Sequence, residues 1–555
     1  MSDLSANYIA TIITIIKIVQ GVPMKILMAA AENDALPKGK VGGIGDVVRD
    51  IPLALANIGQ QVDVVMPGYG SLSLLPGAQH ITALPVMFGG EHQTVDIFKI
   101  SLDHLSKESS NKSASLADKN VTQWVIEHPL FALGGQGKIY CDDPDNRPFA
   151  SDASKFALFS AAVAKAIISD VFGKIDVLHL HDWHTAMVSV LRAYDPQYQL
   201  LQSIKTVYTI HNLALQGIRP IDGDESSLKA WFPSLDFDHS QICDPRYHHC
   251  VNPMRAGINL ADKVHAVSPT YAKEILSPSD PEHGYFGGEG LESDLRLAAD
   301  SGRLHGILNG CEYPENTDDS INARLNFSDL LALAEHELIK WIANKPLVDN
   351  AHLIAMTRIK QLEGKKQPIL LTSVGRITDQ KVRLFQQVIP NGETALEQLL
   401  TLLGDDGVFI LLGSGDKKLE NYLTKIASTQ TNFIFLKGYS ETLSENIYRS
   451  GDLFLMPSSF EPCGISQMLS MRAGQPCLVH SVGGLSDTVI HNQNGFAFSG
   501  DNPLQQGENM LSCFQAAIAM KKQHPKQWLK ISNNALAARF LWRDVAQDYI
   551  NYLYA

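Results

Sequence analysis

Short apolar runs recur along the chain, and each is followed by a small or polar loop and then by a segment with helical patterning. This alternation predicts β–α–β units and parallel sheets. In the first half the runs are Lys25–Ala31, Val62–Met66, Val177–Leu180, Thr206–Ile210 and Val264–Val267. In the second half they are Pro368–Val374, Val408–Leu412, Phe433–Leu436, Leu453–Met456, Cys477–His480 and Gly495–Phe498. The sequence therefore predicts an α/β protein with two doubly wound domains whose strand ends face a deep cleft.

An acidic, turn-rich stretch between Pro278 and Lys366 separates the two series of runs, and we place the domain junction near Gly306–Asn309. The predicted organisation is an N-terminal extension at 1–23, a Rossmann-like domain at 24–305, a second Rossmann-like domain at 306–540, and a closing helix at 541–555.

The extension contains the apolar run Tyr8–Gln20, which has 13 residues. A membrane span needs about 20 residues, and no basic region of a signal peptide precedes this run. We interpret residues 1–23 as an added helix or a misassigned start, with Met24 as the natural beginning.

The charge balance limits the partners. Lys and Arg number 46 against 59 Asp and Glu, which gives a net charge of −13. An acidic chain is a poor ligand for nucleic acid or for an anionic membrane surface, so neither partner is expected. Seven cysteines in 555 residues are too few, and odd in number, for a disulfide framework, which favours a reducing cytoplasm. The oligomeric state is left open.

A glycine-rich segment, Lys40–Val47 (KVGGIGDV), follows the first run. Gly42 and Gly43 allow backbone N–H groups to approach a ligand, and a helix opening at Asp46 would favour an anion at its N-terminus. A tight β–α turn with Lys40 in solvent is the alternative interpretation.

A histidine-rich segment, His179–Thr185 (HLHDWHT), ends a later run. On a strand, His179 and His181 share one face and Asp182 points to the other. We favour binding of sugar hydroxyls over binding of a metal, with a structural polar cluster as the alternative. The two cysteines and two histidines within Cys243–Cys250 do not have a standard zinc spacing, so no metal site is expected.

Two motifs in the second half carry charge at strand ends. Arg376 and Lys381 lie five residues apart across a strand-to-helix turn, which suits a diphosphate; scattered surface charge is the alternative. Glu461 lies within Pro457–Gln467, after another run, where a carboxylate can hold a sugar hydroxyl. Gly483–Thr488 repeats a glycine turn, and taken by itself it is better explained as a plain β–α turn than as a binding loop.

Taken in order, these motifs resemble the glycogen synthase and bacterial and plant starch synthase family of retaining glycosyltransferases, family 5. The matching segments are Lys40–Val47, His179–Thr185, Thr209–Gly217, Ala266–Ile275, Gly306–Gly310, Arg376–Lys381, Gly438–Glu441, Phe460–Gln467 and Gly483–Val489. The resemblance implies a GT-B fold whose second domain binds the nucleotide sugar. It implies transfer of glucose to the non-reducing end 4-OH of an α-1,4-glucan with retention of configuration, with no metal and no other cofactor.

The resemblance also implies roles for individual residues. Catalytic roles fall to Glu461, Arg376, Lys381, His181, Lys40 and Asp152. Donor contacts fall to Lys40, Gly42, Gly43, Asn309, Arg376, Lys381, Tyr439, Cys463, Gly464, Ile465 and Ser466. In this assignment Arg376 and Lys381 bind the diphosphate, and His181 and Glu461 hold the glucose. Asp152 lies towards the acceptor, and Tyr439 flanks the base.

Some features depart from the family or leave alternatives open. Position 469 is Leu, so a second glutamate eight residues after Glu461 is missing, and His480-Ser481 stands where relatives often carry basic residues or Thr. ADP-glucose is the usual donor in bacterial and plastid members, and UDP-glucose stays open. A different GT-B transferase and a catalytically silent glucan-binding partner are the other candidates.

Overall fold

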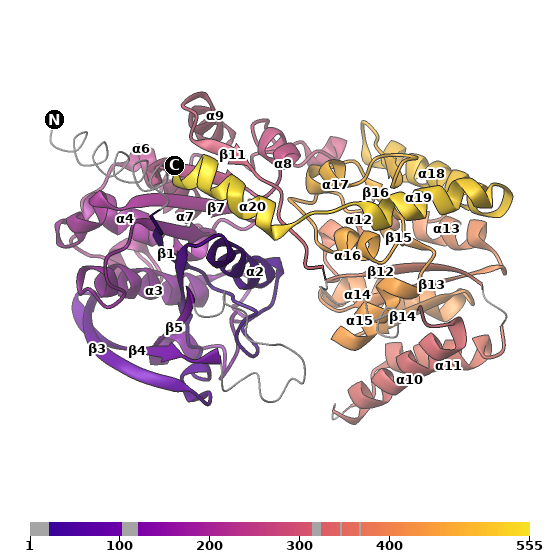
Figure 1. Cartoon of the computed structure of the whole chain (residues 1–555), viewed down its shortest axis with the longest axis horizontal. Helices are drawn as coiled ribbons and strands as arrows, with labels where there is room; N and C mark the ends of the chain where they lie inside the picture. The colour runs from indigo at the N-terminus through magenta and orange to yellow at the C-terminus, as the bar shows by residue number, and fades with distance from the viewer. Residues whose placement is uncertain (1–21, 103–119, 314–323, 345–346, 366–367) are drawn as a thin grey trace. The chain divides into compact units, whose positions relative to one another are not determined.

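The structure, a computed structural model, describes residues 22–102, 120–313, 324–344, 347–365 and 368–555. It divides into two compact units (Figure 1). Unit 1 comprises Met1–Pro278, Gly287–Gly310 and Leu541–Ala555, and unit 2 comprises Ser279–Phe286 and Cys311–Phe540. Of the proposed N-terminal extension at 1–23, residues 1–21 lie outside the described residues. The domain boundaries drawn from the sequence stay a prediction.

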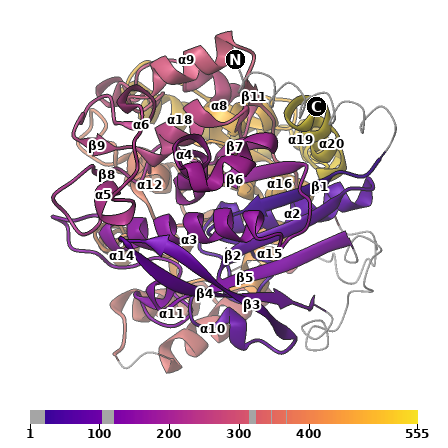
Figure 2. The same cartoon turned by 90° about the vertical axis from the view of Figure 1, so that its left-hand side faces the viewer.

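A nine-stranded sheet forms the centre of unit 1, in the order β11-β10-β7-β6-β1-β2-β5-β4-β3. Pairing is parallel from β11 to β5, whereas β5, β4 and β3 pair antiparallel at one edge (Figure 2). These strands are β1 (Lys25–Ala29), β2 (Gln61–Pro67), β3 (Ala78–Phe88), β4 (Glu91–Ile100), β5 (Val121–Glu127), β6 (Val177–His181), β7 (Lys205–Ile210), β10 (Lys263–Ala266) and β11 (Leu304–Gly306). A separate two-stranded sheet joins β8 (Arg219–Pro220) and β9 (Cys250–Val251).

Helices cover this sheet. The helices of unit 1 are α2 (Gly43–Asn57), α3 (Ala150–Ile168), α4 (Met187–Tyr194), α5 (Leu228–Trp231), α6 (His239–Ile242), α7 (Pro253–Leu260), α8 (Pro269–Glu274), α9 (Glu292–Asp300) and α20 (Trp542–Asp548). Alternate strand residues such as Ile26, Met28 and Val62 pack against α2 and α20 in one apolar cluster. The indole nitrogen of Trp542 donates to Asp50 Oδ2 at 3.1 Å, which fixes α20 beside α2 (Figure 1).

Unit 2 contains a six-stranded, fully parallel sheet in the order β14-β13-β12-β15-β16-β17. Its strands are β12 (Ile369–Val374), β13 (Gly407–Gly413), β14 (Phe433–Lys437), β15 (Leu453–Met456), β16 (Cys477–His480) and β17 (Gly495–Phe498). Its helices are α10 (Phe327–Ala343), α11 (Asn350–Leu362), α12 (Asp379–Gln386), α13 (Ala395–Leu403), α14 (Lys417–Thr429), α15 (Glu441–Ser450), α16 (Ser466–Arg472), α17 (Gly483–Thr488), α18 (Pro503–Gln523) and α19 (Pro525–Ala537).

Both faces of the unit 2 sheet are buried. Along β13, Phe409 and Leu411 join one apolar cluster, whereas Val408, Ile410 and Leu412 join the other. Side chains alternate between faces along a strand, so continuous apolar runs are what a parallel sheet covered by helices on both sides requires. All eleven predicted runs are strands of the two sheets, with ends that differ by at most two residues.

Among the parallel strands of each sheet, the strand order reverses direction at one place. In unit 1 the chain moves outward from β1 through β2 and then returns to β6 on the other side of β1. In unit 2 the reversal lies between β12 and β15. Ligands of open α/β sheets bind beyond the carboxyl ends of the strands at such positions. Among the described residues, no helix combines the length and apolarity needed to cross a bilayer.

Candidate active site

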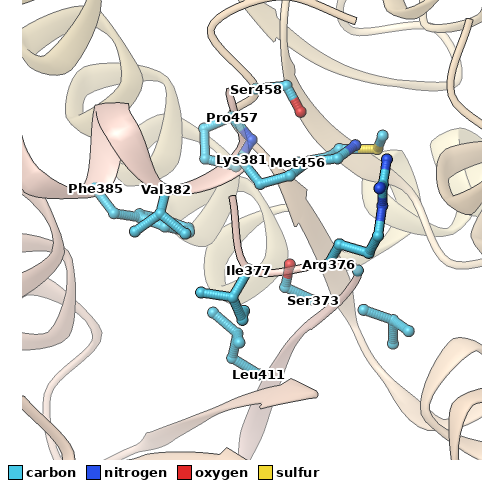
Figure 3. Close-up of a pocket in the computed structure, with 12 residues that line it drawn as sticks. Ser373, Arg376, Ile377, Lys381, Val382, Phe385, Leu411, Met456, Pro457 and Ser458 are labelled. Carbon is cyan, nitrogen blue, oxygen red and sulfur yellow. The ribbon is translucent and has the colours of Figure 1, made fainter. Parts of the chain in front are cut away.

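The loops that follow β12 and β15 line a pocket at the reversal point of unit 2. It is formed by residues such as Gly375, Arg376, Lys381, Met456 and Ser458. Figure 3 shows the side chains of Arg376 and Lys381 extending to the same side of this pocket, next to Met456. The predicted strand-to-helix turn is confirmed, because β12 ends at Val374 and α12 begins at Asp379.

Lys381 and Glu461 form an ion pair within this region. The Glu461 side chain is 9% exposed and that of Lys381 is 25% exposed, so the pair is largely removed from water. Gln380 donates its amide to Glu461 Oε2 at 3.3 Å and to the carbonyl of Phe460 at 2.8 Å. The cation at the start of α12 and the carboxylate in the loop after β15 therefore meet.

A second glycine turn supports the backbone around Glu461. Gly484 donates its N–H to the carbonyl of Glu461 at 3.0 Å. Gly483 has a φ of +43°, and a Cβ placed on it would lie 2.0 Å from the same carbonyl oxygen. A Cβ on Gly484 would lie 2.2 Å from the carbonyl oxygen of Cys463. The glycines of Gly483–Thr488 are thus required by close packing against the Glu461 loop.

The other predicted donor contacts of unit 2 follow the same strand ends. Cys463 is buried, Gly464 has a φ of +77°, and Ile465 and Ser466 open α16. Tyr439 lies between β14 and α15 and is 64% exposed. An aromatic ring exposed at a strand end can stack on a planar group.

In unit 1 the glycine-rich loop follows β1, and α2 begins at Gly43, three residues before the helix start predicted at Asp46. A Cβ on Gly43 would meet no atom within 4 Å, so packing does not require a glycine there. Lys40 forms an ion pair with Asp46 and lies 3.6 Å from Asp34. The loop thus presents a lysine and an open backbone position at the N-terminus of a 15-residue helix, which favours anions.

Glu32 is a residue of this region that the sequence analysis missed. Its carboxylate accepts the N–H groups of Val41 at 2.7 Å and of Gly42 at 2.6 Å, and the hydroxyl of Tyr140 at 2.7 Å. The Gly42 N–H is therefore occupied by an internal anion. The sequence did contain a sign of Glu32: it is a carboxylate that follows the first apolar run, just as Glu461 follows a later one.

The histidine-rich segment follows β6, across the reversal point from the glycine-rich loop. The rings of His179 and His181 are stacked with centroids 4.5 Å apart, which confirms that they share one face of the strand. His181 Nδ1 lies 3.0 Å from His211 Nε2, and His181 Nε2 is buried without a hydrogen-bond partner. Burial lowers the pKa of His181 well below its usual value, so the ring is neutral at pH 7.

Asp182 turns the chain at the end of β6. It has a φ of +54°, and its carboxylate accepts the N–H of His211 at 2.8 Å. Burial raises the pKa of Asp182 to about 8, and burial lowers the pKa of His184 to about 3. The segment is therefore held in a water-poor setting in which charge is disfavoured.

The two remaining predicted residues are both buried. Asn309 is 4% exposed, and its side-chain oxygen has no hydrogen-bond partner. Asp152, at the start of α3, forms an ion pair at 2.6 Å with Lys155, which is 1% exposed, and accepts the N–H of Cys141. The Asp152 carboxylate is thus one member of a buried ion pair.

Among the described residues, no group of three or more His, Cys, Asp or Glu side chains is arranged to hold a metal ion. Cys243 and Cys250 are both buried free thiols.

Comparison with known proteins agrees with this architecture. Residues 25–297 match the family described as "Starch synthase catalytic domain", and residues 356–523 match "Glycosyl transferases group 1". A glycogen synthase of Natranaerobius thermophilus is 32% identical over 95% of this chain and 96% of its own.

Two solved structures share the fold. The catalytic domain of starch synthase IV from Arabidopsis thaliana, bound to ADP and acarbose, is 25% identical with a TM-score of 0.69, over 96% of this chain and 98% of its own. A sucrose-phosphate synthase from Thermosynechococcus elongatus is 15% identical with a TM-score of 0.50, over 95% of this chain and 97% of its own, which shows the fold alone.

Two Rossmann-like units with charged loops at both reversal points, together with these matches, define a glycosyltransferase of the GT-B fold. More narrowly, the chain belongs to the glycogen synthase family.

Proposed function

We propose that the protein transfers glucose from ADP-glucose to the non-reducing end 4-OH of an α-1,4-glucan, with retention of configuration and without a metal ion. The observation that carries the proposal is the meeting of Arg376, Lys381 and Glu461 at the reversal point of unit 2. Two cations suit the diphosphate of a sugar nucleotide, and the carboxylate suits sugar hydroxyls.

In this proposal Arg376 and Lys381 stabilise the negative charge that develops on the departing diphosphate. Because Lys381 is paired with Glu461 in the structure, donor binding gives the cation a second anionic partner. Glu461 then accepts hydrogen bonds from the glucose. A transition state with oxocarbenium character depends more on a stabilised leaving group than on a strong base.

Unit 1 contributes Lys40, the open position at Gly43, and His181 in this proposal. The buried Nε2 of His181 has no hydrogen-bond partner, and an unsatisfied buried polar atom costs about 1–3 kcal/mol. A glucose hydroxyl would satisfy it. Asn309, with an unsatisfied side-chain oxygen, is a second position with unused hydrogen-bonding capacity.

The choice of nucleotide rests on a relative. The starch synthase IV structure contains ADP and acarbose, which favours an adenine donor and a glucan acceptor for this chain too. The exposed Tyr439 is the side chain we assign to the base.

The test follows labelled glucose from ADP-glucose and UDP-glucose, in parallel, into glycogen and maltooligosaccharides in the presence of a chelator. Glu461→Gln keeps the side-chain shape without the charge and is the matched variant. Product sensitivity to an α-1,4-specific glucanase reports the anomeric configuration.

The expected result is chelator-resistant incorporation from ADP-glucose that is lost in Glu461→Gln and released by the glucanase. Incorporation from UDP-glucose alone would show that the donor is UDP-glucose and not ADP-glucose. A protein that binds glucan but incorporates nothing from either donor would overturn the proposal in favour of a silent glucan-binding protein.

A further inference from the structure

The segment after α20 continues as a π-helical turn, η8 (Tyr549–Tyr554). In an α-helix, residues five apart point about 140° away from each other. The wider π turn reduces this angle, and both Tyr549 and Tyr554 are fully buried against the sheet of unit 1. Single π turns are uncommon and occur frequently at functional sites.

From Tyr554 a buried chain of hydrogen bonds crosses three strands. The Tyr554 hydroxyl lies 2.8 Å from His179 Nδ1 on β6. His179 Nε2 lies 2.6 Å from Thr209 Oγ1 on β7, which lies 3.0 Å from His265 Nδ1 on β10. His265 Nε2 lies 3.1 Å from the carbonyl oxygen of Ile307, two residues before Asn309.

The direction of every bond in this chain follows from its last member. A carbonyl oxygen only accepts, so His265 Nε2 carries the proton and its Nδ1 accepts from the Thr209 hydroxyl. Thr209 Oγ1 must then accept from His179 Nε2–H, which leaves His179 Nδ1 as an acceptor for the Tyr554 hydroxyl. This ordering requires neutral rings, and burial lowers the pKa of His265 to about 4 and that of His179 well below its usual value.

The far side of His179 leads to the candidate site. Its ring is stacked on His181, with the planes 15° apart. His181 is itself stacked on His211 at 5.3 Å, and its Nε2 is the buried atom without a partner. The plane of His179 therefore limits the plane of His181 and the direction in which that Nε2 points.

We propose that Tyr554 is a positioning residue for glucosyl transfer: its hydroxyl donates to His179 Nδ1 and fixes the ring plane of His179, and His179 fixes His181 by stacking. A segment distant in sequence from both site loops thus completes the site of unit 1. This inference rests on the proposed function, because it assigns His181 a contact with the sugar.

The test compares Tyr554→Phe with two control variants. Tyr549→Phe removes another buried hydroxyl from the same turn, 3.4 Å from His265 Nδ1, which keeps its bond to Thr209. Tyr552→Phe removes an exposed hydroxyl. Tyr554→Phe is expected to lower kcat by about 10- to 100-fold, as misplacement of a reacting group does, with both KM values within about twofold. The controls are expected to stay within about twofold of wild type in kcat.

A double-mutant cycle with His181→Ala separates positioning from general weakening of the fold. If Tyr554 acts through His181, Tyr554→Phe has no further effect on kcat in the His181→Ala background. An equal effect in both backgrounds, or an equal loss in Tyr549→Phe, overturns the inference.

A second readout does not depend on activity. In protein labelled with ¹⁵N-histidine, the NMR shift of a bare ring nitrogen depends on whether it accepts a hydrogen bond, and Tyr554→Phe is expected to move the shift of His179 Nδ1. An unchanged Nδ1 shift overturns the inference. Wild-type protein that is inactive with both donors overturns the proposed function, whereas active wild type with unaltered Tyr554→Phe overturns this inference alone.

Discussion

At the scale of single residues, the ion pair between Lys381 and Glu461 joins two side chains that the proposed reaction uses on different parts of the donor. Arg376 lines the same pocket. Because the Lys381 side chain is three-quarters buried, truncating it removes packed methylene groups as well as the charge.

Lys381→Ala and Arg376→Ala are each expected to lower kcat by about 10²- to 10³-fold, the usual loss for one group that stabilises transition-state charge. Steady-state incorporation of labelled glucose measures this effect. Lys425→Ala, which removes an exposed lysine from α14, is the matched control and should retain wild-type kcat. Full activity in Lys381→Ala would contradict the proposal that this pocket binds the diphosphate.

Gly43 and Gly45 form a matched pair on one helix. A Cβ on Gly43 meets nothing, whereas one on Gly45 lies 2.9 Å from Lys40 Cβ. Gly43→Ala should therefore keep or slightly raise the melting temperature, since alanine favours helix by up to about 1 kcal/mol, and should raise the donor KM. Gly45→Ala should lower the melting temperature. An unchanged donor KM in Gly43→Ala would mean that the donor does not approach this position.

Sequence patterns located some of these residues and missed others. Arg376, Lys381 and Glu461 could be found because charges at strand ends stand out against apolar runs. Gln380 could not, because a glutamine next to a lysine gives no sign that its amide reaches Phe460 and Glu461, some eighty residues away. The Asp152–Lys155 pair was hidden for a similar reason, since burial of Lys155 depends on tertiary packing.

At the scale of elements, most strands buried on both faces were predicted, whereas the half-exposed strands and the largely buried β5 were not. The antiparallel hairpin of β3 and β4 has mostly polar or exposed positions along β3, so it lacks the apolar run that marked the parallel strands. The very short β8, β9 and β11 carry too few residues for any pattern. The pattern of apolar residues thus indicates which segments are buried, and it indicates a strand only where the strand is buried.

The turn before α17 gives a prediction at this scale. Gly483→Ala is expected to lower the free energy of unfolding by about 1–3 kcal/mol, as overpacking does, and to lower kcat because the Cβ displaces the carbonyl of Glu461. Denaturant unfolding and labelled-glucose incorporation measure the two effects.

Gly392→Ala is the control for backbone strain alone. Gly392 also has a positive φ, of +87°, but a Cβ there would meet no atom within 4 Å. Gly392→Ala should lower the free energy of unfolding by about 1–2 kcal/mol, because alanine is strained in this left-handed conformation, and should keep its kcat. Equal losses of kcat in both variants would show that the Glu461 loop does not depend on the close approach of Gly483.

At the scale of the whole molecule, each unit contains a buried histidine whose proton uptake opposes folding. Burial lowers the pKa of His265 in unit 1 and of His480 in unit 2 to about 4 each. Unfolded histidine titrates near 6.5, so below this pH the unfolded chain binds more protons. Stability is therefore fully present above pH 6.5 and is lost as the pH falls towards 4.

For His480 alone, the expected loss of stability between pH 7.5 and pH 5 is about 2 kcal/mol. Denaturant unfolding of the wild type and of His480→Gln at both pH values measures it. Glutamine keeps a donor for the carbonyl of Ser458, which His480 contacts at 3.0 Å. The variant should show a smaller difference between the two pH values; an equal difference would contradict the assignment to His480.

The two-domain character of the chain could be predicted from the alternation of strands and helices, but the way the chain is shared between units could not. The excursion Ser279–Phe286 belongs to unit 2 because Phe286 packs on Phe460 at 4.8 Å and Gln506 donates to the Gly284 carbonyl. Such contacts join residues more than 170 positions apart, so no local sequence pattern predicts them.

The return of the chain to unit 1 through Leu541–Ala555 has a consequence for biosynthesis. Trp542, Tyr549 and Tyr554 cover an apolar face formed by β1 and α2, yet the ribosome makes them only after all of unit 2. At about 5–20 residues per second, nascent unit 1 carries that uncovered face for ten seconds or more, while the second unit is able to fold. The first unit to be synthesised is thus the last to be completed, and the uncovered face is where a chaperone would engage the growing polypeptide.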